Sequence, residues 1–379
     1  NSGRGFQNLF ERFCEPQNHY DLLVLKGGPG AGKSTMMRKL GAAMEARGEQ
    51  VEYLHCSGDP ESLDGVHIPR IRTAVADGTS PHVIEPQYPA AVDRYVNLGE
   101  FYDIAAAKDS RDEIERWSNA CSEAYHCAYR VLGAARQVND NASALMLQEL
   151  DNHKLVRRTE GIISRELRGR GKGGLDQFRF LGSLTYQGAI WRFDSVEKLC
   201  PRIYHLIDSA GIAAKMLEQI HEAARTRLFS SVLCPDPEHM ERLQHLLIPE
   251  LGVAFITSTE GMECPCPAYR RIHLDAMVAP EHIKRWKGRL KFMRKMTQTL
   301  REEGVQLLRE AKNALLKIAG FTRFMDSLIF VGLPCAYHGK LYNVAAAISE
   351  GKILGFVPKS CIPNYNEFYE GRHFAVGMA

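Results

Sequence analysis

The first part of the chain alternates short apolar runs with one amphipathic stretch. Asp21–Lys26 (DLLVLK) is a continuous apolar run that stops at glycines, and this pattern predicts a buried strand. Apolar residues at helical spacing follow the glycines, and Gly48 marks the expected end of that helix. Val51–Cys56 (VEYLHC) predicts the next strand, so strand, loop, helix and strand follow in the order of a parallel α/β sheet. The apolar face of the predicted helix holds Met36, Met37, Leu40, Ala43 and Met44.

Longer helical segments follow this unit. Ile71–Asp77 (IRTAVAD) predicts a third strand, which ends on a carboxylate. Much of Ser110–Leu167 is rich in Ala, Glu, Arg and Leu, which predicts long helices. These helices form an insertion over about residues 102–175 that we expect to act as a lid or a helical subdomain. The insertion runs into the basic segment Arg168–Gly174 (RGRGKGG), where glycines predict a flexible loop. Another long helix is predicted over Pro280–Ile318.

An internal repeat relates the two halves of the chain at an offset of about 180 residues. The segment Leu251–Thr257 (LGVAFIT) echoes the third strand of the first half. Lys215–Arg227 likewise echoes the first amphipathic helix. We therefore expect two copies of one α/β domain. The remaining echoes pair Cys56, Asp59–Pro60 and Ile68–Pro69 with Cys234, Asp236–Pro237 and Ile248–Pro249.

The glycine-rich segment after the first strand fits a phosphate-binding P-loop in full. Its sequence GGPGAGKS matches the pattern G-x-x-x-x-G-K-[ST]. Glycines let the backbone fold around a phosphate with N–H groups pointing inward, and the following helix presents its positive N-terminus to the same anion. Lys33 is expected to reach the β- and γ-phosphates, and Ser34 to offer its hydroxyl to Mg²⁺. The motif predicts binding of Mg-ATP through Gly27, Gly28, Pro29, Gly30, Ala31, Gly32, Lys33, Ser34 and Thr35.

A carboxylate is expected to assist the magnesium ion. Asp77 ends an apolar strand, where it would hold the metal through water and act with Lys33 in catalysis. Asp59 and Asp64 on the neighbouring loop are rivals for this role. A structural alternative for Asp77 is an ordinary strand-end turn, because Asp-Gly favours turns. The basic loop Arg168–Gly174 could close over the γ-phosphate, or it could be a solvated linker.

The second copy departs from the first at the P-loop. Where the first copy has GGPGAGKS, the second has Ile207–Ala214 (IDSAGIAA), with one glycine and no Lys-Ser pair. Thr257 stands in the place of Asp77. We therefore expect the second loop to form no N–H nest and the chain to bind one nucleotide.

These motifs give an α/β fold class with three segments. Residues 1–180 are expected to form a P-loop NTPase domain with a parallel sheet and the helical insertion. Residues 181–319 are expected to form the second, degenerate P-loop-like repeat, ending in the long basic helix. Residues 320–379 form a short β-rich appendage. Its expected strands are Ser327–Pro334, Lys340–Ile348 and Lys352–Pro358.

Composition narrows the class of protein. The 48 basic and 45 acidic residues leave a net charge of +3, which argues against a wholesale nucleic-acid binder. No apolar run reaches the length of a membrane span, and we expect no signal peptide. Ten cysteines in 379 residues are too dilute for a disulfide scaffold, so we expect reduced thiols and a cytoplasmic protein. A basic run from Lys284 to Lys295 contains no acid, which leaves open a nucleic-acid, acidic-lipid or protein partner, or a solvated helix face.

Residues 1 to about 320 resemble a poorly characterised bacterial family of tandem P-loop ATPases. The resemblance lies in LKGGPGAGKSTMMRKLG, VEYLHCSGDPESLDGVHIP, DGTSPHVIEPQYPAAVDRYVNLGEFYD and LLIPELGVAFITS. It implies nucleotide binding in the first half. Members of the family usually carry a second glycine-rich P-loop, and this chain departs from the family there.

The tail resembles a different protein family. Residues from about 320 to 379 look like part of the nitrilase-type glutaminase domain of glutamine-dependent NAD synthetase, through VGLPCAYHGKLYNVAAAISEGKILGFVPKSCIPNYNEFYEGRHF. The resemblance implies that Lys359 matches the lysine of that family and Glu367 a supporting glutamate. The general-base glutamate of the family lies upstream of this stretch and its nucleophilic cysteine downstream, and Cys335 and Cys361 fall outside the context of the nucleophile. A natural fusion, a fragment and a joining error in the source sequence would all give this arrangement.

Four functions remain open from the sequence. The first is a Mg-dependent ATPase with one active nucleotide site. The second is a nucleotide or small-molecule kinase, and the third is a non-catalytic protein that only binds nucleotide. The fourth is a fragment or fusion of a glutamine-dependent NAD synthetase. The choice of ATP over GTP is not fixed, because no base-reading motif of the N-K-x-D kind is evident.

Overall fold

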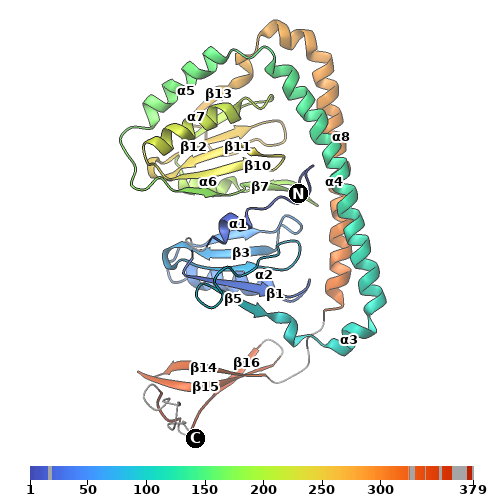
Figure 1. Cartoon of the computed structure of the whole chain (residues 1–379), viewed down its shortest axis with the longest axis vertical. Coiled ribbons are helices and arrows are strands. Elements are labelled where there is room, and N and C mark those ends of the chain that lie inside the picture. The colour runs from blue at the N-terminus through green and yellow to red at the C-terminus, as the bar shows by residue number, and fades with distance from the viewer. Residues whose placement is uncertain are drawn as a thin grey trace. The chain divides into compact units, whose positions relative to one another are not determined.

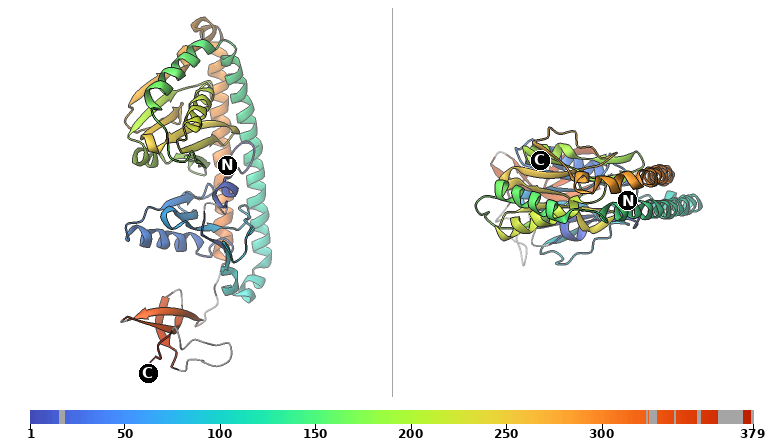
Figure 2. Two further views of the ribbon diagram at one scale, coloured as in Figure 1. Left: turned by 60° about the vertical axis from the view of Figure 1, so that its left-hand side comes forward. Right: turned by 90° about the horizontal axis from the view of Figure 1, so that it is seen from above.

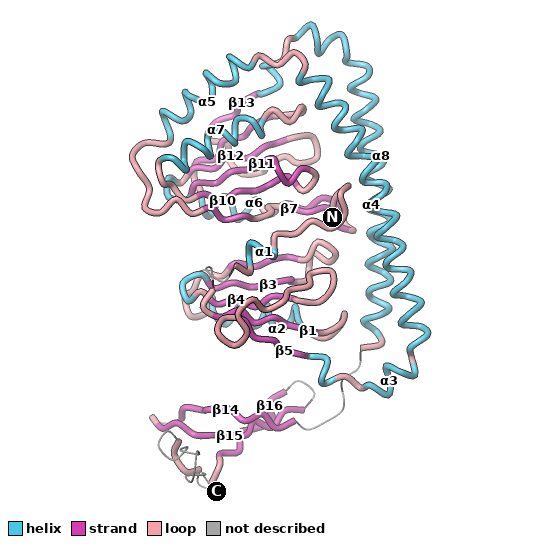
Figure 3. Tube along the Cα trace, in the orientation of Figure 1, coloured by secondary structure: helices cyan, strands magenta, loops and turns pink. Residues whose placement is uncertain are grey.

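The computed structural model describes residues 1–15, 19–322, 324, 329–337, 339–349, 352–360 and 374–377. The chain divides into two compact units. One unit comprises Asn1–Glu100 and Asp109–Thr322, and the other comprises Phe101–Lys108 and Arg323–Ala379. Figure 1 labels many of the elements of both units, and Figure 3 colours them by secondary structure.

The first sheet has five strands in the order β2-β3-β4-β1-β5. Strand β1 pairs in parallel with β4 and with β5, whereas β3 pairs antiparallel with β2 and with β4. Strand β1 is buried at Leu22, Val24 and Leu25, as expected of a strand that is covered on both faces. The elements are α1 (Phe10–Phe13), β1 (Asp21–Lys26), α2 (Lys33–Glu45), β2 (Glu52–His55), β3 (Leu63–Ile68), the 3₁₀ turn η2 (Pro69–Ile71), β4 (Thr73–Asp77), β5 (Asp93–Asn97) and the 3₁₀ turn η3 (Leu98–Phe101).

The buried face of α2 differs in part from the prediction. Met37 is fully buried and packs with Leu25 of β1, and Leu40 packs against the same cluster. Met36 and Ala43, which the sequence assigned to the apolar face, are exposed. The predicted helix is correct, but its buried face is centred on Met37, Leu40 and Gly41. Gly41 belongs to this face because it lies against Tyr53 of β2.

The third predicted strand begins two residues later than expected. Pro69–Ile71 forms a 3₁₀ turn and Arg72 has a φ of 52°, so β4 begins at Thr73. The apolar pattern that suggested a strand from Ile71 therefore includes a turn, since a left-handed residue cannot continue an extended strand.

The second sheet repeats the topology of the first. Its six strands lie in the order β13-β9-β12-β11-β10-β6, and β9 pairs in parallel with β12 and β13. Strand β11 pairs antiparallel with β10 and β12. The elements of this half are β6 (Asp176–Phe178), β7 (Gly182–Thr185), β8 (Gly188–Trp191), α6 (Phe193–Leu199), β9 (Arg202–Ile207), α7 (Ala213–Thr226), β10 (Ser231–Asp236), β11 (His239–Ile248), η4 (Pro249–Leu251), β12 (Val253–Ser258), β13 (Arg270–His273) and η5 (Leu274–Met277).

The two sheets correspond element by element. Reading β10, β11, β12, β9 and β13 for β2, β3, β4, β1 and β5 gives the same order and the same relative directions. The registers also agree, because Gly65 pairs with Ala76 in the first sheet and His245 pairs with Ile256 in the second. Each of these second-sheet residues lies 180 positions after its first-sheet counterpart. The sequence echo and the strand topology therefore describe one repeat.

Two long helices run antiparallel beside the sheets. Helix α4 (Arg111–Leu147) packs along α8 (Pro280–Gly320), as Figures 1 and 2 show. Cys121 and Ala124 of α4 pack with Ala311 and Ala314 of α8, while Leu132 lies against Gly304. Small residues at these positions allow the two helices to approach closely. The shorter helix α3 (Ile104–Asp109) precedes α4.

The predicted helical insertion is divided between two environments. Helix α4 packs on α8, whereas α5 (Asn152–Glu166) contributes Leu155 and Ile162 to the core of the second sheet. The boundary expected at residue 180 therefore does not separate the two cores. Helix α5 packs on the second sheet through long-range contacts, and the apolar periodicity of the helix does not reveal which sheet it packs against.

The unit that contains the tail has a three-stranded antiparallel sheet in the order β14-β15-β16. Strands β14 and β15 pair over nine residue pairs, from Ile329 with Ile348 to Tyr337 with Lys340. The β-rich tail predicted from the sequence is thus confirmed. The strands are β14 (Ile329–Tyr337), β15 (Lys340–Ser349) and β16 (Lys352–Pro358). Across the described residues of the whole chain, no helix combines the length and the apolarity that a bilayer span requires.

Candidate functional site

The P-loop sequence forms a tight connection between β1 and α2. Gly30 and Gly32 have φ values of +85° and +77°, which side-chain-bearing residues rarely adopt. Helix α2 then begins at Lys33, directly after the second of these glycines. The glycines of the motif therefore set the path of the backbone at the helix N-terminus.

The N-terminus of α2 carries backbone N–H groups that are available to an anion. In the described part of the chain, the N–H groups of Gly30, Gly32 and Lys33 donate to no protein acceptor. Ser34 lies one residue further along, and its Oγ accepts a hydrogen bond from the N–H of Leu63 at 3.0 Å. An exposed helix N-terminus with unpaired N–H groups attracts phosphate through both hydrogen bonding and the helix dipole.

Lys33 and Asp77 face each other beside this loop. Lys33 Nζ lies 3.5 Å from Asp77 Oδ2, and the two side chains are only 10% and 14% exposed. Lys33 Nζ also donates to the carbonyl oxygens of Gly27 and, at 3.0 Å, Gly28. The other oxygen of Asp77 accepts from the N–H of Thr79 at 2.8 Å. The structure thus brings together the lysine at the start of α2 and the carboxylate at the end of β4.

The two rival carboxylates have other partners. Asp59 Oδ2 lies 2.7 Å from Nζ of Lys312 on α8. Asp64 Oδ2 lies 3.1 Å from Nε2 of His82. Among the three candidates, Asp77 is the carboxylate that contacts the P-loop lysine within the described residues.

The basic loop Arg168–Gly174 contacts the second copy. The N–H of Gly171 donates to the carbonyl of Arg227 at 2.8 Å, and that of Gly173 donates to the carbonyl of Leu228 at 3.3 Å. The loop joins α5 to β6, an edge strand of the second sheet. These contacts do not support the hypothesis that the loop covers the γ-phosphate, because they hold the loop against the second copy and the P-loop lies in the first.

The second-copy loop does form an N–H nest, so the expectation of no nest was wrong. Asp208 Oδ1 accepts from the N–H groups of Ala210 and Gly211 at 2.9 and 3.0 Å, and Oδ2 accepts from that of Ala213 at 2.7 Å. Asp208 is 2% exposed. Burial raises the pKa of Asp208, and backbone N–H donors, among them those of Ala210 and Ala213, oppose that shift. A side-chain carboxylate of the chain itself thus occupies the anion position of the second loop.

The end of α8 lies against the first P-loop, which the sequence did not reveal. Thr322 donates its hydroxyl to the carbonyl of Pro29. A Cβ added to Gly30 would lie 3.0 Å from the carbonyl oxygen of Ala319. With the ion pair between Lys312 and Asp59, these contacts connect the last turns of α8 to the P-loop and to the loop after β2. They join residues almost 300 positions apart, and no local pattern signals such a contact.

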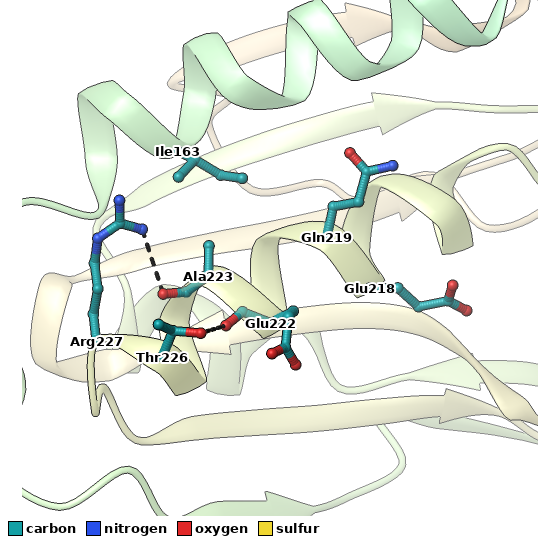
Figure 4. Close-up of a pocket in the computed structure, with 7 residues that line it drawn as sticks. All are labelled: Ile163, Glu218, Gln219, Glu222, Ala223, Thr226 and Arg227. Atoms are coloured by element: carbon teal, nitrogen blue, oxygen red, sulfur yellow. Dashed lines mark hydrogen bonds between the residues drawn. The ribbon is translucent and has the colours of Figure 1, made fainter.

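A surface groove with a volume of about 660 Å³ lies in the second half, between α5 and α7 (Figure 4). Two of the polar groups drawn there bond to carbonyls one turn earlier, since Arg227 donates to the carbonyl of Ala223 and Thr226 to that of Glu222. No residue of the first P-loop lines it, so the groove is separate from the candidate nucleotide site. Its lining consists of Ile163, Glu218, Gln219, Glu222, Ala223, Thr226 and Arg227.

The tail residues singled out by the sequence are described in part. Lys359 directly follows β16, and its N–H donates to the carbonyl of Asn343 at 2.8 Å. Cys335 lies on β14. Cys361 and Glu367 lie outside the described residues. The described tail therefore presents the lysine of the glutaminase resemblance on a small antiparallel sheet.

Comparison with known proteins supports the resemblance to glutamine-dependent NAD synthetase. The chain is 39% identical over 71 residues to the glutamine-dependent NAD(+) synthetase of Mycobacterium tuberculosis, and 41% identical over 70 residues to that of Aquifex aeolicus. These matches cover 19% and 18% of this chain, but only 10% and 12% of the two relatives. The chain thus spans about a tenth of the length of the curated relatives that it matches. No protein-family model matches the chain, and no solved structure matches it.

Proposed function

We propose that the chain binds Mg-ATP at Gly27–Thr35 and hydrolyses it at this single site. The observation that carries the proposal is the 3.5 Å approach of Lys33 Nζ to Asp77 Oδ2 beside the unpaired N–H groups of Gly30 and Lys33. A cation, a carboxylate and an N–H nest are the three groups that a magnesium-bound triphosphate requires.

Each residue has a distinct part in this proposal. The N–H groups at the start of α2 hold phosphate oxygens, and Lys33 exchanges its contacts with carbonyl oxygens for the β- and γ-phosphates. Ser34 and Asp77 supply the oxygen atoms that Mg²⁺ prefers, Asp77 through water. When bound, the ion neutralises charge on the transferring phosphoryl group.

Binding and turnover measurements distinguish an ATPase from a kinase and from a non-catalytic nucleotide-binding protein. The purified chain is titrated with Mg-ATP and Mg-GTP by calorimetry, and phosphate release is then followed with and without a panel of acceptors. Release of phosphate without an acceptor supports the ATPase. A kinase would turn over only with an acceptor, and a non-catalytic binder would show tight binding without turnover. Absence of saturable binding of either nucleotide by the folded chain would contradict the proposal.

The second candidate is a segment of a glutamine-dependent NAD synthetase, favoured by the 39–41% identity of about 70 residues to such enzymes. Amide hydrolysis of this type needs a thiolate nucleophile, a base and an oxyanion-stabilising lysine. The resemblance supplies Lys359, while the base and the nucleophile lie beyond the matching stretch. We therefore propose that this chain alone releases no ammonia from glutamine. Ammonia release that disappears in Cys361→Ala would favour the glutaminase instead.

A further inference from the structure

Three metal-ligating side chains of different type meet in the first copy. They are Cys56, which follows β2, Asp64 on β3 and His82 in the segment after β4. One ligand atom from each lies within 4.8 Å of the others. Among the described residues this is the one group of three or more such side chains at that spacing.

The contacts converge on the carboxylate of Asp64. His82 Nε2 lies 3.1 Å from Asp64 Oδ2, and the Cys56 thiol also hydrogen-bonds to Asp64. A nucleophilic triad would instead place the imidazole between the thiol and the carboxylate. The arrangement is therefore one of convergent ligands and not a proton relay.

The surroundings favour a bound thiolate and hold the imidazole in place. The backbone N–H groups of Gly58 and Asp59 both donate to the sulfur of Cys56. His82 is 8% exposed and lies between the rings of Phe6 and Phe10, with centroids 4.9 and 4.8 Å away. Buried polar groups normally bond to a partner, yet His82 Nδ1 has none in the described part of the chain.

The second copy has the same strand order without a cysteine or a histidine at the equivalent positions. The positions 180 residues after Cys56, Asp64 and His82 hold Asp236, Gln244 and Met262, and Cys234 lies two residues before Asp236. The turn before the histidine is the same in both copies, because His82 N–H donates to Thr79 at 2.8 Å and Met262 N–H donates to Thr259 at 2.9 Å. Cys234 and Met262 are both buried in one apolar cluster. The second copy therefore lacks the combination of thiol, carboxylate and imidazole that the first copy holds at these positions.

We propose that Cys56, Asp64 and His82 bind a divalent transition-metal ion of the zinc class. Sulfur, imidazole nitrogen and carboxylate oxygen together match the borderline-soft preference of Zn²⁺, whereas Mg²⁺ and Ca²⁺ prefer oxygen alone. Three protein ligands leave a fourth position for water or for an oxygen of a bound molecule. The inference does not depend on nucleotide binding at the P-loop.

The site has a direct connection to the P-loop. Leu63, the residue before Asp64, donates its N–H to Ser34 Oγ at 3.0 Å. A metal ion here would fix the segment between Cys56 and Asp64, and with it the backbone group that orients the Ser34 hydroxyl. A bound ion would therefore stabilise the position of Ser34 through Leu63 on β3.

The test measures metal binding by the full chain without nucleotide. Purified protein is stripped of metal and titrated with Co²⁺, a spectroscopic substitute for Zn²⁺, and then with Zn²⁺ in competition. We expect one equivalent, a near-ultraviolet sulfur-to-cobalt charge-transfer band, and release of the thiol proton. Cys56→Ser, Asp64→Asn and His82→Gln should each weaken binding by more than about 100-fold, since loss of an outer-shell partner alone typically costs 10–100-fold. Cys234→Ser is the matched control and should bind as the parent does.

Two results would overturn the proposal. The first is a folded parent chain that binds neither ion or binds cobalt without the charge-transfer band. The second is binding that survives all three ligand substitutions or is lost in Cys234→Ser. Circular dichroism shows whether each variant is folded. The parent spectrum decides the question even where a variant does not fold.

Discussion

Asp208 Oδ2 accepts a hydrogen bond from the backbone N–H of Ala213 at 2.7 Å, at the first residue of α7. Asp208 stands 180 residues after Gly28, and Ala213 stands 180 residues after Lys33. The N–H group that a phosphate would meet in the first copy is therefore bonded to a carboxylate in the second. Since the first copy has glycine at this position, its nest stays open.

The correspondence predicts that Gly28→Asp closes the first P-loop. The new carboxylate should reach the N–H groups at the start of α2 and repel triphosphate, while the fold is retained because the second copy tolerates the same residue. We expect at least a tenfold loss of Mg-ATP affinity by calorimetry, about 1.4 kcal/mol. Gly28→Asn has the same size without the charge and should retain more affinity. Equal loss in both variants would point to steric damage instead.

A second prediction concerns stoichiometry. We expect one nucleotide per chain by equilibrium dialysis, because the second nest is filled and lacks a lysine. Asp208→Ala should still bind one nucleotide. It should also lower the free energy of unfolding by roughly 1–3 kcal/mol, since buried N–H groups lose their acceptor. Two sites of similar affinity in the parent chain would refute this account.

Lys33→Ala tests the role of the P-loop cation. Its removal takes away a point charge beside the phosphates, so we expect Mg-ATP affinity to fall at least tenfold, about 1.4 kcal/mol, and hydrolysis to stop. The exposed Lys215 on α7 provides the control, because Lys215→Ala removes a lysine from the corresponding helix of the other copy. Unchanged affinity in a folded Lys33→Ala protein would show that the nucleotide binds elsewhere.

The sequence predicted those parts of the fold that depend on local pattern. The run Asp21–Lys26 gave a strand and the start of α2 followed the glycines, because apolar periodicity and glycine spacing act over a few residues. It failed at Ile71, where a turn hides inside an apolar run. The nest around Asp208 was missed because the bond from a side chain to its own loop depends on the conformation of that loop.

Contacts between segments that are distant in the sequence could not be predicted, for a different reason. Cys56, Asp64 and His82 match no metal motif by spacing, and only the pairing of β2, β3 and β4 brings them together. The contact of Thr322 with Pro29 likewise depends on how α8 packs. Such juxtapositions are properties of the assembled fold.

At Gly41 we expect a glycine-to-alanine substitution to lower stability, which is the opposite of its usual effect in a helix. Replacing a helical glycine by alanine usually stabilises by about 0.5–1 kcal/mol. At Gly41 of α2, however, a Cβ would lie 2.4 Å from the ring of Tyr53. We therefore expect Gly41→Ala to lower the urea midpoint. Gly161→Ala on α5 should raise it, since no atom lies within 4 Å of its Cβ position. A rise in both variants would mean that Tyr53 moves aside without cost.

The final prediction is an acid-sensitive core at His245. This residue is fully buried on β11, and its Nδ1 accepts from the N–H of Thr257 at 3.1 Å, so the ring is neutral with its proton on Nε2. Burial lowers the pKa of His245 to about 3. The rings of Trp191 and Phe193 lie 6.0 and 5.9 Å away, and the shift has burial as its cause, with no contribution from a charged group of the described residues.

The sign of the pH effect follows from the two states. In the unfolded chain His245 has an ordinary pKa near 6.5, so below that pH the unfolded state binds a proton that the folded state excludes. Stability should therefore fall as the pH drops from about 6.5 to about 3, by up to about 1.4 kcal/mol per pH unit from this residue. Urea unfolding followed by tryptophan fluorescence at several pH values measures the slope. His245→Gln should flatten the slope and His126→Gln, on the exposed face of α4, should not. A slope unchanged by His245→Gln would place the acid sensitivity in other groups, because a neutral amide cannot take up the proton.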